Sequence, residues 1–122
     1  MFLVLLVEDD PIFRKILKHE LAHWFPSINI EEASDGKEAV AKTEASCPQI
    51  VFMDIRLPDE SGLQLTKKIR AKCPGTSIAI LTSHDSPEYR QAAKDCGASH
   101  FFVKGASDGC EIQSFVKSFL EG

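Results

Sequence analysis

The sequence has no long apolar run, no Cys-x-x-Cys pair and no excess of basic residues. The apolar stretch at residues 1–7 lacks a basic start and ends at Glu8, so it is too short for a signal peptide, and no longer run suggests a membrane span. The net charge of −4, from 14 basic and 18 acidic residues, argues against non-specific binding of nucleic acid by this domain. We therefore expect a soluble cytoplasmic protein that contacts neither membrane nor nucleic acid directly.

The four cysteines are too widely spaced for a familiar metal-site or disulfide pattern. They are Cys47, Cys73, Cys96 and Cys110. Four reduced thiols, as in a cytosolic protein, are the prediction. Two of these cysteines precede prolines, Pro48 and Pro74, and these pairs predict helix ends because proline cannot continue a helix.

The length of 122 residues fits a single domain covering residues 1–122, and the chain has no repeats, linkers or low-complexity segments. Continuous apolar runs predict buried strands, and an alternating segment predicts a half-exposed edge strand. The expected strands are residues 2–7, 28–33, 50–53, 77–81 and 100–103. Helices are expected at residues 11–25, 37–46, 60–72 and 86–95, with a last one starting at Asp108 or Gly109.

This strict alternation predicts an α/β fold, a doubly wound five-stranded parallel sheet with five helices. Strand order does not follow from pattern alone, but a polar second strand at an edge is compatible with the order 2-1-3-4-5. In the first helix, one apolar face is expected to reach the core. Its residues are Phe13, Ile16, Leu17, Leu21 and Trp24.

Charged and hydroxyl side chains follow the central strands at the points where the strands end. Glu8 and Asp9 follow the first strand and Asp54 the third, while Thr82 and Lys104 end the fourth and fifth. The carboxyl ends of parallel strands lie on one rim, so these groups should converge. Clustered carboxylates repel unless a cation lies among them, and oxygen ligands with room for water suit Mg²⁺.

An aspartate beside a metal and a lysine is arranged for nucleophilic attack on phosphorus, giving an aspartyl phosphate. Each residue also has a simpler interpretation. Asp54 could only open a turn, residues 8–10 could only cap a helix, Thr82 could be a strand-end hydroxyl and Lys104 a solvated cation.

Taken together, the motifs resemble the receiver domain of bacterial two-component response regulators, over essentially the whole chain. The matching segments are residues 7–11 (VEDDP), 35–39 (DGKEA), 53–58 (MDIRLP), 81–83 (LTS) and 97–104 (GASHFFVK). The resemblance implies a flavodoxin-like fold in which Asp54 accepts a phosphoryl group from a sensor histidine kinase or a phosphotransfer protein. It also implies that the domain catalyses only its own phosphorylation and slow dephosphorylation.

The resemblance further implies Mg²⁺ bound by Asp9, Asp54 and the backbone carbonyl of Arg56, with Glu8 acting through water. Thr82 and Lys104 would contact the phosphoryl group. Their rearrangement would change the face built by the helix at 86–95, the strand at 100–103 and the last helix. That face would meet a target protein, an output domain or a second copy in a homodimer.

Two positions depart from the family pattern. Receivers commonly have proline after the lysine, usually behind a cis bond, and here the residue is Gly105. A cis bond before a residue other than proline costs about 3–4 kcal/mol, so the geometry of the Lys104–Gly105 bond is left open. Phe101 stands where the switch aromatic is often tyrosine, so a ring movement is retained and a hydroxyl hydrogen bond is not.

The segment from His19 to His23 matches H-E-x-x-H, the zinc metalloprotease signature. Both histidines should project from the first helix into solvent, and no third ligand stands out, so catalysis by this motif is not expected. His84 and His100 are expected to be a loop residue and an edge-strand residue.

Two other functions remain as alternatives. A Mg²⁺-dependent phosphatase with Asp54 as nucleophile would need an acid two residues later, where Arg56 stands, and usually a cap. A pseudo-receiver, a binding module that is never phosphorylated, would have no need of the complete set of site residues.

Overall fold

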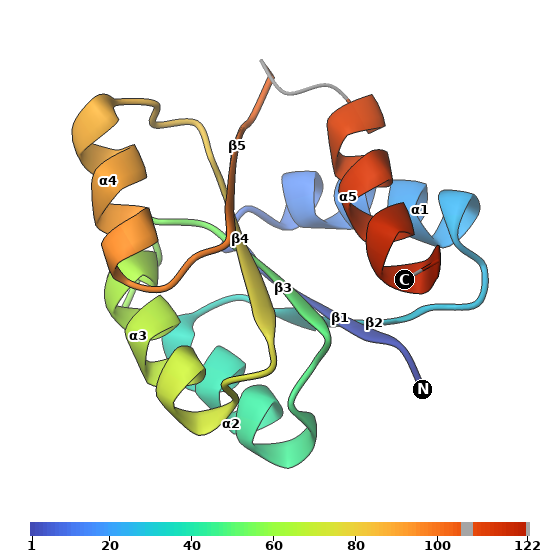
Figure 1. Ribbon diagram of the computed structural model, residues 1–122, viewed down its shortest axis with the longest axis horizontal. Coiled ribbons are helices and arrows are strands. Elements are labelled where there is room, and N and C mark those ends of the chain that lie inside the picture. Colours follow the sequence, from blue (N-terminus) through green and yellow to red (C-terminus); the bar gives the residue numbers. More distant parts are fainter. Residues whose placement is uncertain (106–108, 122) are drawn as a thin grey trace.

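The chain folds as five β-α units that build one parallel sheet with helices on both faces (Figure 1). The computed structural model describes residues 1–105 and 109–121. The strands are β1 (Leu3–Val7), β2 (Asn29–Ala33), β3 (Ile50–Met53), β4 (Ser77–Thr82) and β5 (His100–Val103). The helices are α1 (Pro11–Trp24), α2 (Gly36–Ser46), α3 (Gly62–Lys72), α4 (Pro87–Asp95) and α5 (Gly109–Glu121).

The strand order is β2-β1-β3-β4-β5, all parallel, which confirms the predicted fold. β1 and β3 are neighbours, with Val7 opposite Met53 at their carboxyl ends. The chain leaves β1 toward one side of the sheet and β3 toward the other, so a crevice at the topological switch point opens beside these two strand ends. β2 and β5 are the edges.

The sheet separates two apolar cores because successive side chains of a strand point to opposite faces. Val4 and Leu6 of β1 belong to the core under α1 and α5. Leu5 and Val7 belong to the core under α2, α3 and α4. Figure 1 shows the same division, with α1 and α5 on one side of the sheet and the other three helices opposite. Coverage on both faces explains why the central strands are continuous apolar runs.

The starts of three helices follow from capping residues in the sequence. The Asp10 carboxylate accepts a hydrogen bond from the Ile12 amide (3.0 Å), with Pro11 in the first turn. Asp35 caps α2 and Ser86 caps α4 in the same manner. A side-chain oxygen at this position satisfies an amide that has no partner inside the helix.

Two helix details differ from the prediction. α3 begins at Gly62 rather than residue 60, because Ser61 caps it through the Leu63 amide (3.1 Å) and Gly62 donates its amide to the Ile55 carbonyl (2.7 Å). In α1, Ile16 is 52% exposed although it was expected in the apolar face. Successive helical residues are turned by about 100°, so a helix that buries Leu17 turns Ile16 out of the interface. The predicted start at Asp108 lies outside the described residues.

The prediction of four reduced thiols is wrong for two cysteines. Cys47 and Cys73 form a disulfide, with their Cα atoms 5.6 Å apart, while Cys96 and Cys110 are free. The two bonded residues follow the last residues of α2 and α3, and these helices lie side by side on one face of the sheet (Figure 1). Sequence spacing gave no sign of this pairing because the cysteines stand 26 positions apart, and it is the fold of β3, its loop and α3 between them that brings the helix ends together.

Candidate functional site

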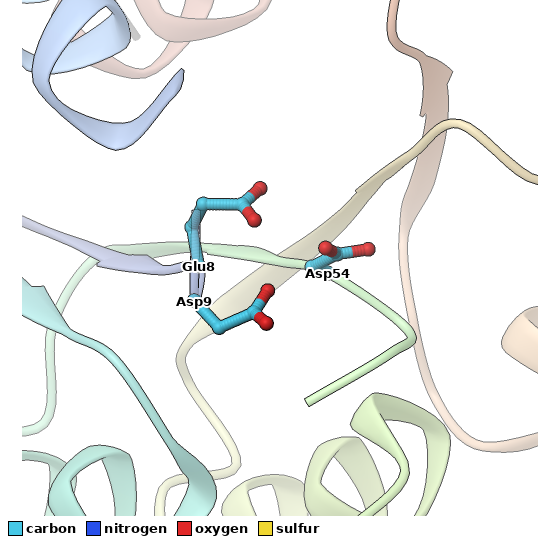
Figure 2. Close-up of side chains that lie close together, drawn as sticks. All are labelled: Glu8, Asp9 and Asp54. Atoms are coloured by element: carbon cyan, nitrogen blue, oxygen red, sulfur yellow. The ribbon is translucent and has the colours of Figure 1, made fainter. Parts of the chain in front are cut away.

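Three carboxylates converge where β1 and β3 end. Glu8, Asp9 and Asp54 each place one carboxylate oxygen within 4.8 Å of the others (Figure 2). Their backbone positions are fixed by the sheet, since the Asp54 amide donates to the Val7 carbonyl (3.1 Å) and the Glu8 amide to the Ala33 carbonyl (3.0 Å). Neighbouring parallel strands therefore bring together acids that lie more than forty positions apart.

The acidic group is buried at two of its three members. Glu8 is 5% exposed and Asp54 is 7% exposed, whereas Asp9 faces solvent. Burial raises the pKa of the Glu8 carboxyl to about 7, and the negative charge of Asp54 adds to the rise, against the opposing hydrogen bonds from Lys104 and the Asp10 amide. A site with this excess of negative charge favours a proton or a cation near Glu8.

Lys104 is the cation that the structure places among these acids. Its ammonium lies 2.5 Å from Glu8 Oε1 and 3.3 Å from Asp54 Oδ2. Burial alone would lower the pKa of Lys104, but its hydrogen bond to Glu8 and the charges of Asp54 and Glu8 outweigh this and hold the pKa above its ordinary value. The same ammonium lies over the ring of Phe13, 4.4 Å from its centroid, on the side of α1.

The structure gives the geometry of the Lys104–Gly105 peptide bond, which the sequence left open. The described residues contain no cis peptide bond, so the Lys104–Gly105 bond is trans. Gly105 has φ +82, a conformation that glycine adopts without a Cβ penalty. The backbone of Lys104 is held to β4, because its amide donates to the Thr82 carbonyl (2.8 Å).

Thr82 and Phe101 lie on the strands beside the acids. The Thr82 side chain is fully buried at the end of β4, and its hydroxyl accepts a hydrogen bond from the His84 amide (3.3 Å). Phe101 of β5 is partly buried in the core beneath α4, and the Arg90 guanidinium lies 4.8 Å from its ring centroid. Arg90 is fixed in turn by Asp85 (2.7 Å) in the loop that follows Thr82.

The loop between β3 and α3 carries the Arg56 carbonyl and folds back on itself. Arg56 pairs with Ser61 in an isolated antiparallel bridge. Gly62 closes the loop, and a Cβ on it would lie 1.9 Å from the Asp54 carbonyl oxygen, so only glycine fits.

Sequence reasoning missed the contact that docks this loop. Both carboxylate oxygens of Asp59 accept hydrogen bonds at the start of α2, from the Gly36 amide (2.8 Å) and the Lys37 amide (3.0 Å). The Gly36 hydrogen bond holds the pKa of Asp59 below its ordinary value. An acid at a helix start is a recognisable signal, but here the helix is 22 residues earlier in the chain, so nothing local pointed to it.

In the described part of the chain, the H-E-x-x-H histidines do not belong to a group of three or more potential metal ligands. His19 and His23 are exposed on α1, as expected. Among residues 1–105 and 109–121, the metal-capable cluster found is Glu8, Asp9 and Asp54. His84 lies in the loop before α4 and His100 opens the edge strand β5, as predicted.

Known proteins that resemble this chain identify its family. A family model for the response regulator receiver domain matches residues 4–114. The chain belongs to this family. The acidic rim, the buried aspartate after β3 and the lysine after β5 all lie within the matched residues.

Curated relatives of this receiver domain are named as regulators of transcription. The transcriptional activator protein ExaE of Pseudomonas putida is 31% identical over 119 residues, which cover 98% of this chain and 55% of ExaE. The DNA-binding transcriptional activator DevR/DosR of Mycobacterium tuberculosis is 34% identical over 123 residues, covering 100% of this chain and 56% of that protein. The chain spans about half the length of these two relatives.

A solved relative of the receiver domain contains a metal. The response regulator protein TrrA from Thermotoga maritima, in complex with Mg²⁺-BeF, is 31% identical, with a TM-score of 0.83. The match covers 97% of this chain and 98% of TrrA. In the described part of the present chain, no helix is both long and apolar enough to cross a membrane.

Proposed function

We propose that this receiver domain accepts a phosphoryl group on Asp54 from a phosphohistidine of a sensor histidine kinase or a phosphotransfer protein. The observation that supports this most strongly is the buried Asp54 carboxylate, 3.3 Å from the Lys104 ammonium and grouped with Glu8 and Asp9. A carboxylate at the switch point of a parallel sheet is open to a ligand at the rim while its strand stays fixed.

The transfer is a nucleophilic substitution at phosphorus. An Asp54 carboxylate oxygen forms the new O–P bond, the P–N bond of the phosphohistidine breaks, and the imidazole leaves with the electron pair. Lys104 has three N–H donors and already contacts Asp54, so its ammonium is placed to donate to oxygens of the arriving phosphoryl group. The Thr82 hydroxyl supplies a second donor from the neighbouring strand.

The donor set of the site fits Mg²⁺. Three carboxylates with an oxygen each within 4.8 Å form a hard, all-oxygen set. Burial raises the pKa of Glu8, and the neighbouring Asp54 charge adds to the rise, so a cation in this group would favour its ionised form. Asp9, Asp54 and the Arg56 carbonyl would hold the ion, with Glu8 acting through water. When bound, the ion offsets negative charge on the carboxylates and on the transferring phosphoryl oxygens.

The output surface is the face formed by α4, β5 and α5. Phe101 and Arg90 connect this face to the loop after Thr82, where a phosphoryl group would first be sensed. A phosphoryl group that draws the Thr82 hydroxyl away from the His84 amide would shift this loop and, through Asp85 and Arg90, the Phe101 ring. An output domain, a target protein or a second receiver would read the change. We place this signalling in the cytoplasm.

The decisive test is intact mass spectrometry after incubation with acetyl phosphate and Mg²⁺. One added phosphoryl group is expected on the wild-type chain and none on Asp54→Asn or in EDTA. Asp95→Asn, an exposed residue at the end of α4 and outside the acidic cluster, serves as the matched aspartate control and should still be phosphorylated.

The test also separates this function from its alternatives. Absence of an adduct with every phosphodonor, a histidine kinase included, would contradict the proposal and favour a pseudo-receiver. Rapid turnover of an unrelated phosphomonoester would instead indicate a phosphatase.

A further inference from the structure

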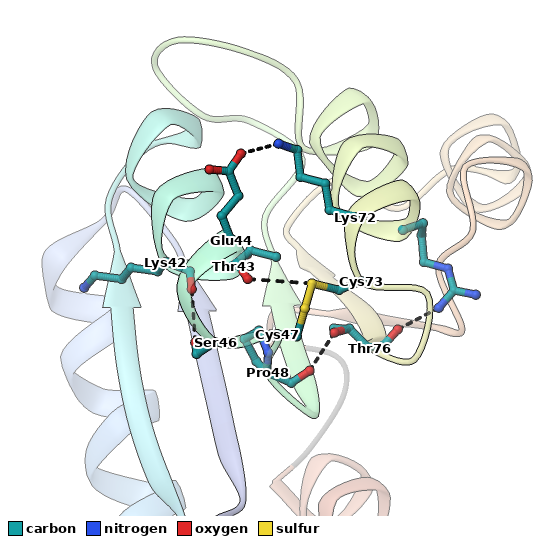
Figure 3. Close-up of a disulfide and its surroundings, with 10 residues drawn as sticks. Lys42, Thr43, Glu44, Ser46, Cys47, Pro48, Lys72, Cys73 and Thr76 are labelled. Carbon is teal, nitrogen blue, oxygen red and sulfur yellow. Dashed lines mark hydrogen bonds and ion pairs between the residues drawn. A yellow bond between two sulfur atoms is a disulfide. The ribbon is translucent and has the colours of Figure 1, made fainter.

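The disulfide joins the two helices that flank the β3 segment. Cys47 caps α2 and Cys73 caps α3, and the bond links the carboxyl-terminal ends of both helices (Figure 3). Figure 3 also shows the Lys72–Glu44 ion pair crossing between the same helices, beside the bridge. The sulfur bridge lies at the opposite end of the sheet from Asp54, so the phosphoryl site does not require it chemically.

The two bonded cysteines differ in their exposure to solvent. Cys47 belongs to the exposed residues, whereas Cys73 is only 3% exposed. An incoming thiol or disulfide can therefore reach the bridge from the Cys47 side and not from the Cys73 side. Because exchange requires direct attack on a sulfur atom, the Cys47 sulfur is the entry point.

The fold also accommodates the reduced pair. The Cys73 sulfur lies 3.6 Å from the Thr43 carbonyl oxygen, so a Cys73 thiol has an acceptor ready after the bridge is broken. Free cysteine otherwise behaves as a small apolar residue, which suits the buried position of Cys73. Two hydrogen bonds that do not involve the bridge also connect segments at this end of the molecule, from the Thr76 hydroxyl to the Pro48 carbonyl (2.6 Å) and from Arg70 to the Thr76 carbonyl (2.6 Å).

We propose that Cys47 and Cys73 form a reversible thiol–disulfide site that exchanges with a low-molecular-weight thiol of the glutathione class, entering at Cys47. The inference rests on the proposed function in one respect, because a cytoplasmic receiver meets a thiol pool that reduces ordinary disulfides. A pair that is close enough to bond and well housed when reduced can exist in both states there.

The exchange balances with glutathione as the co-reactant. In oxidation, the Cys47 thiolate attacks glutathione disulfide and releases one glutathione thiolate. The Cys73 thiolate then attacks the Cys47 sulfur and releases the second. In reduction, a glutathione thiolate attacks the Cys47 sulfur, and the Cys73 thiolate leaves and takes up a proton. A second glutathione thiolate then attacks the glutathione sulfur of the mixed disulfide, which forms glutathione disulfide and releases the Cys47 thiolate.

Reduction would remove the covalent tie on α2, the helix whose first turn also binds the loop after Asp54. The first turn of α2 binds Asp59 through the Gly36 and Lys37 amides, while its last turn is tied to α3 by the bridge. Reduction leaves α2 anchored at its first turn and removes the covalent tie at its last, where the Lys72–Glu44 ion pair remains. Faster amide exchange is therefore expected in the last turns of α2 and α3 in the reduced protein.

The test uses the full chain with Cys96→Ser and Cys110→Ser, so that only the pair can react. The protein is equilibrated without denaturant in glutathione buffers of graded ratio, quenched with acid, alkylated and weighed. Complete interconversion in both directions is expected across these ratios. A bridge that survives excess reduced glutathione until the protein is unfolded, or a pair that never closes in excess glutathione disulfide, would overturn the proposal.

Single variants test the entry point. In glutathione disulfide, the Cys73→Ser chain should form a glutathione adduct on Cys47 at least tenfold faster than the Cys47→Ser chain forms one on Cys73. Equal rates, or the reverse order, would refute entry at Cys47. Asp54→Asn in the same background should exchange normally, so loss of phosphorylation and loss of redox exchange are separate results.

Discussion

The metal-free receiver should become less stable as pH rises from 5 to 8, and Glu8 should account for the change. In the folded chain the pKa of Glu8 is raised by burial from 4.5 to about 7. Between these values the folded state binds a proton that the unfolded state has released, so the free energy of unfolding falls with rising pH. The stabilising proton is fully bound below pH 4.5 and is lost as the pH passes through about 7.

The size of the effect follows from the same values. A pKa difference of one corresponds to about 1.4 kcal/mol, so the rise from 4.5 to about 7 corresponds to about 3 kcal/mol at alkaline pH. Because Glu8 is only 5% exposed, solvent screening should reduce this free-energy difference only slightly. Glu8→Gln removes the titrating group. Between pH 5 and pH 8 the free energy of unfolding of the variant should therefore rise by about 2.5 kcal/mol relative to that of the wild type.

Urea unfolding in EDTA, followed by fluorescence of Trp24, the sole tryptophan, measures both proteins across this range. Glu44→Gln is the matched control, since the Glu44 side chain is 51% exposed and should leave the pH dependence unchanged. Saturating Mg²⁺ should flatten the wild-type curve by favouring ionised Glu8. A wild-type minus Glu8→Gln difference that stays constant from pH 5 to pH 8 would refute the reasoning.

Three further predictions concern the loop and the bridge. Gly62→Ala should lower the free energy of unfolding, measured by urea titration, by more than about 2 kcal/mol, because a Cβ would lie 1.9 Å from the Asp54 carbonyl oxygen. Gly75→Ala is the control and should be nearly neutral, because a Cβ there would meet nothing within 4 Å. Reducing the disulfide should lower the free energy of unfolding by about 3.5 kcal/mol, the loop-closure value for a ring spanning 26 positions. A loss below about 1 kcal/mol would argue against this entropic account of the stabilisation. Asp59→Ala should weaken Mg²⁺ binding several-fold and speed amide exchange at Gly36; unchanged calorimetric Mg²⁺ affinity would show that the docked loop does not position the metal ligands.

Much of the fold was predictable because hydrophobic pattern and capping residues agree. Apolar runs identified the central strands, and Pro11 and Ser86 fixed helix starts to within a residue. The convergence of Glu8, Asp9 and Asp54 followed from parallel topology alone, since strand ends share a rim.

What could not be predicted depends on distances between segments far apart in the chain. The Cys47–Cys73 bridge requires two helix ends to lie side by side, and cysteine spacing carries no such information. The docking of Asp59 on α2 is of the same kind. Phe13 was predicted as a core residue from helical spacing, and its additional contact with the Lys104 ammonium depends on where β5 ends relative to α1.

The disulfide also determines which peptides stay together when the protein is digested. Trypsin cleavage after lysine and arginine yields residues 43–56, which contain both Cys47 and Asp54, and residues 73–90, which begin with Cys73. In the oxidised protein these two peptides remain covalently joined. A digest without reductant therefore carries Asp54, the proposed phosphoacceptor, and the disulfide on a single species, whose mass reports phosphorylation and bridge formation together for each molecule.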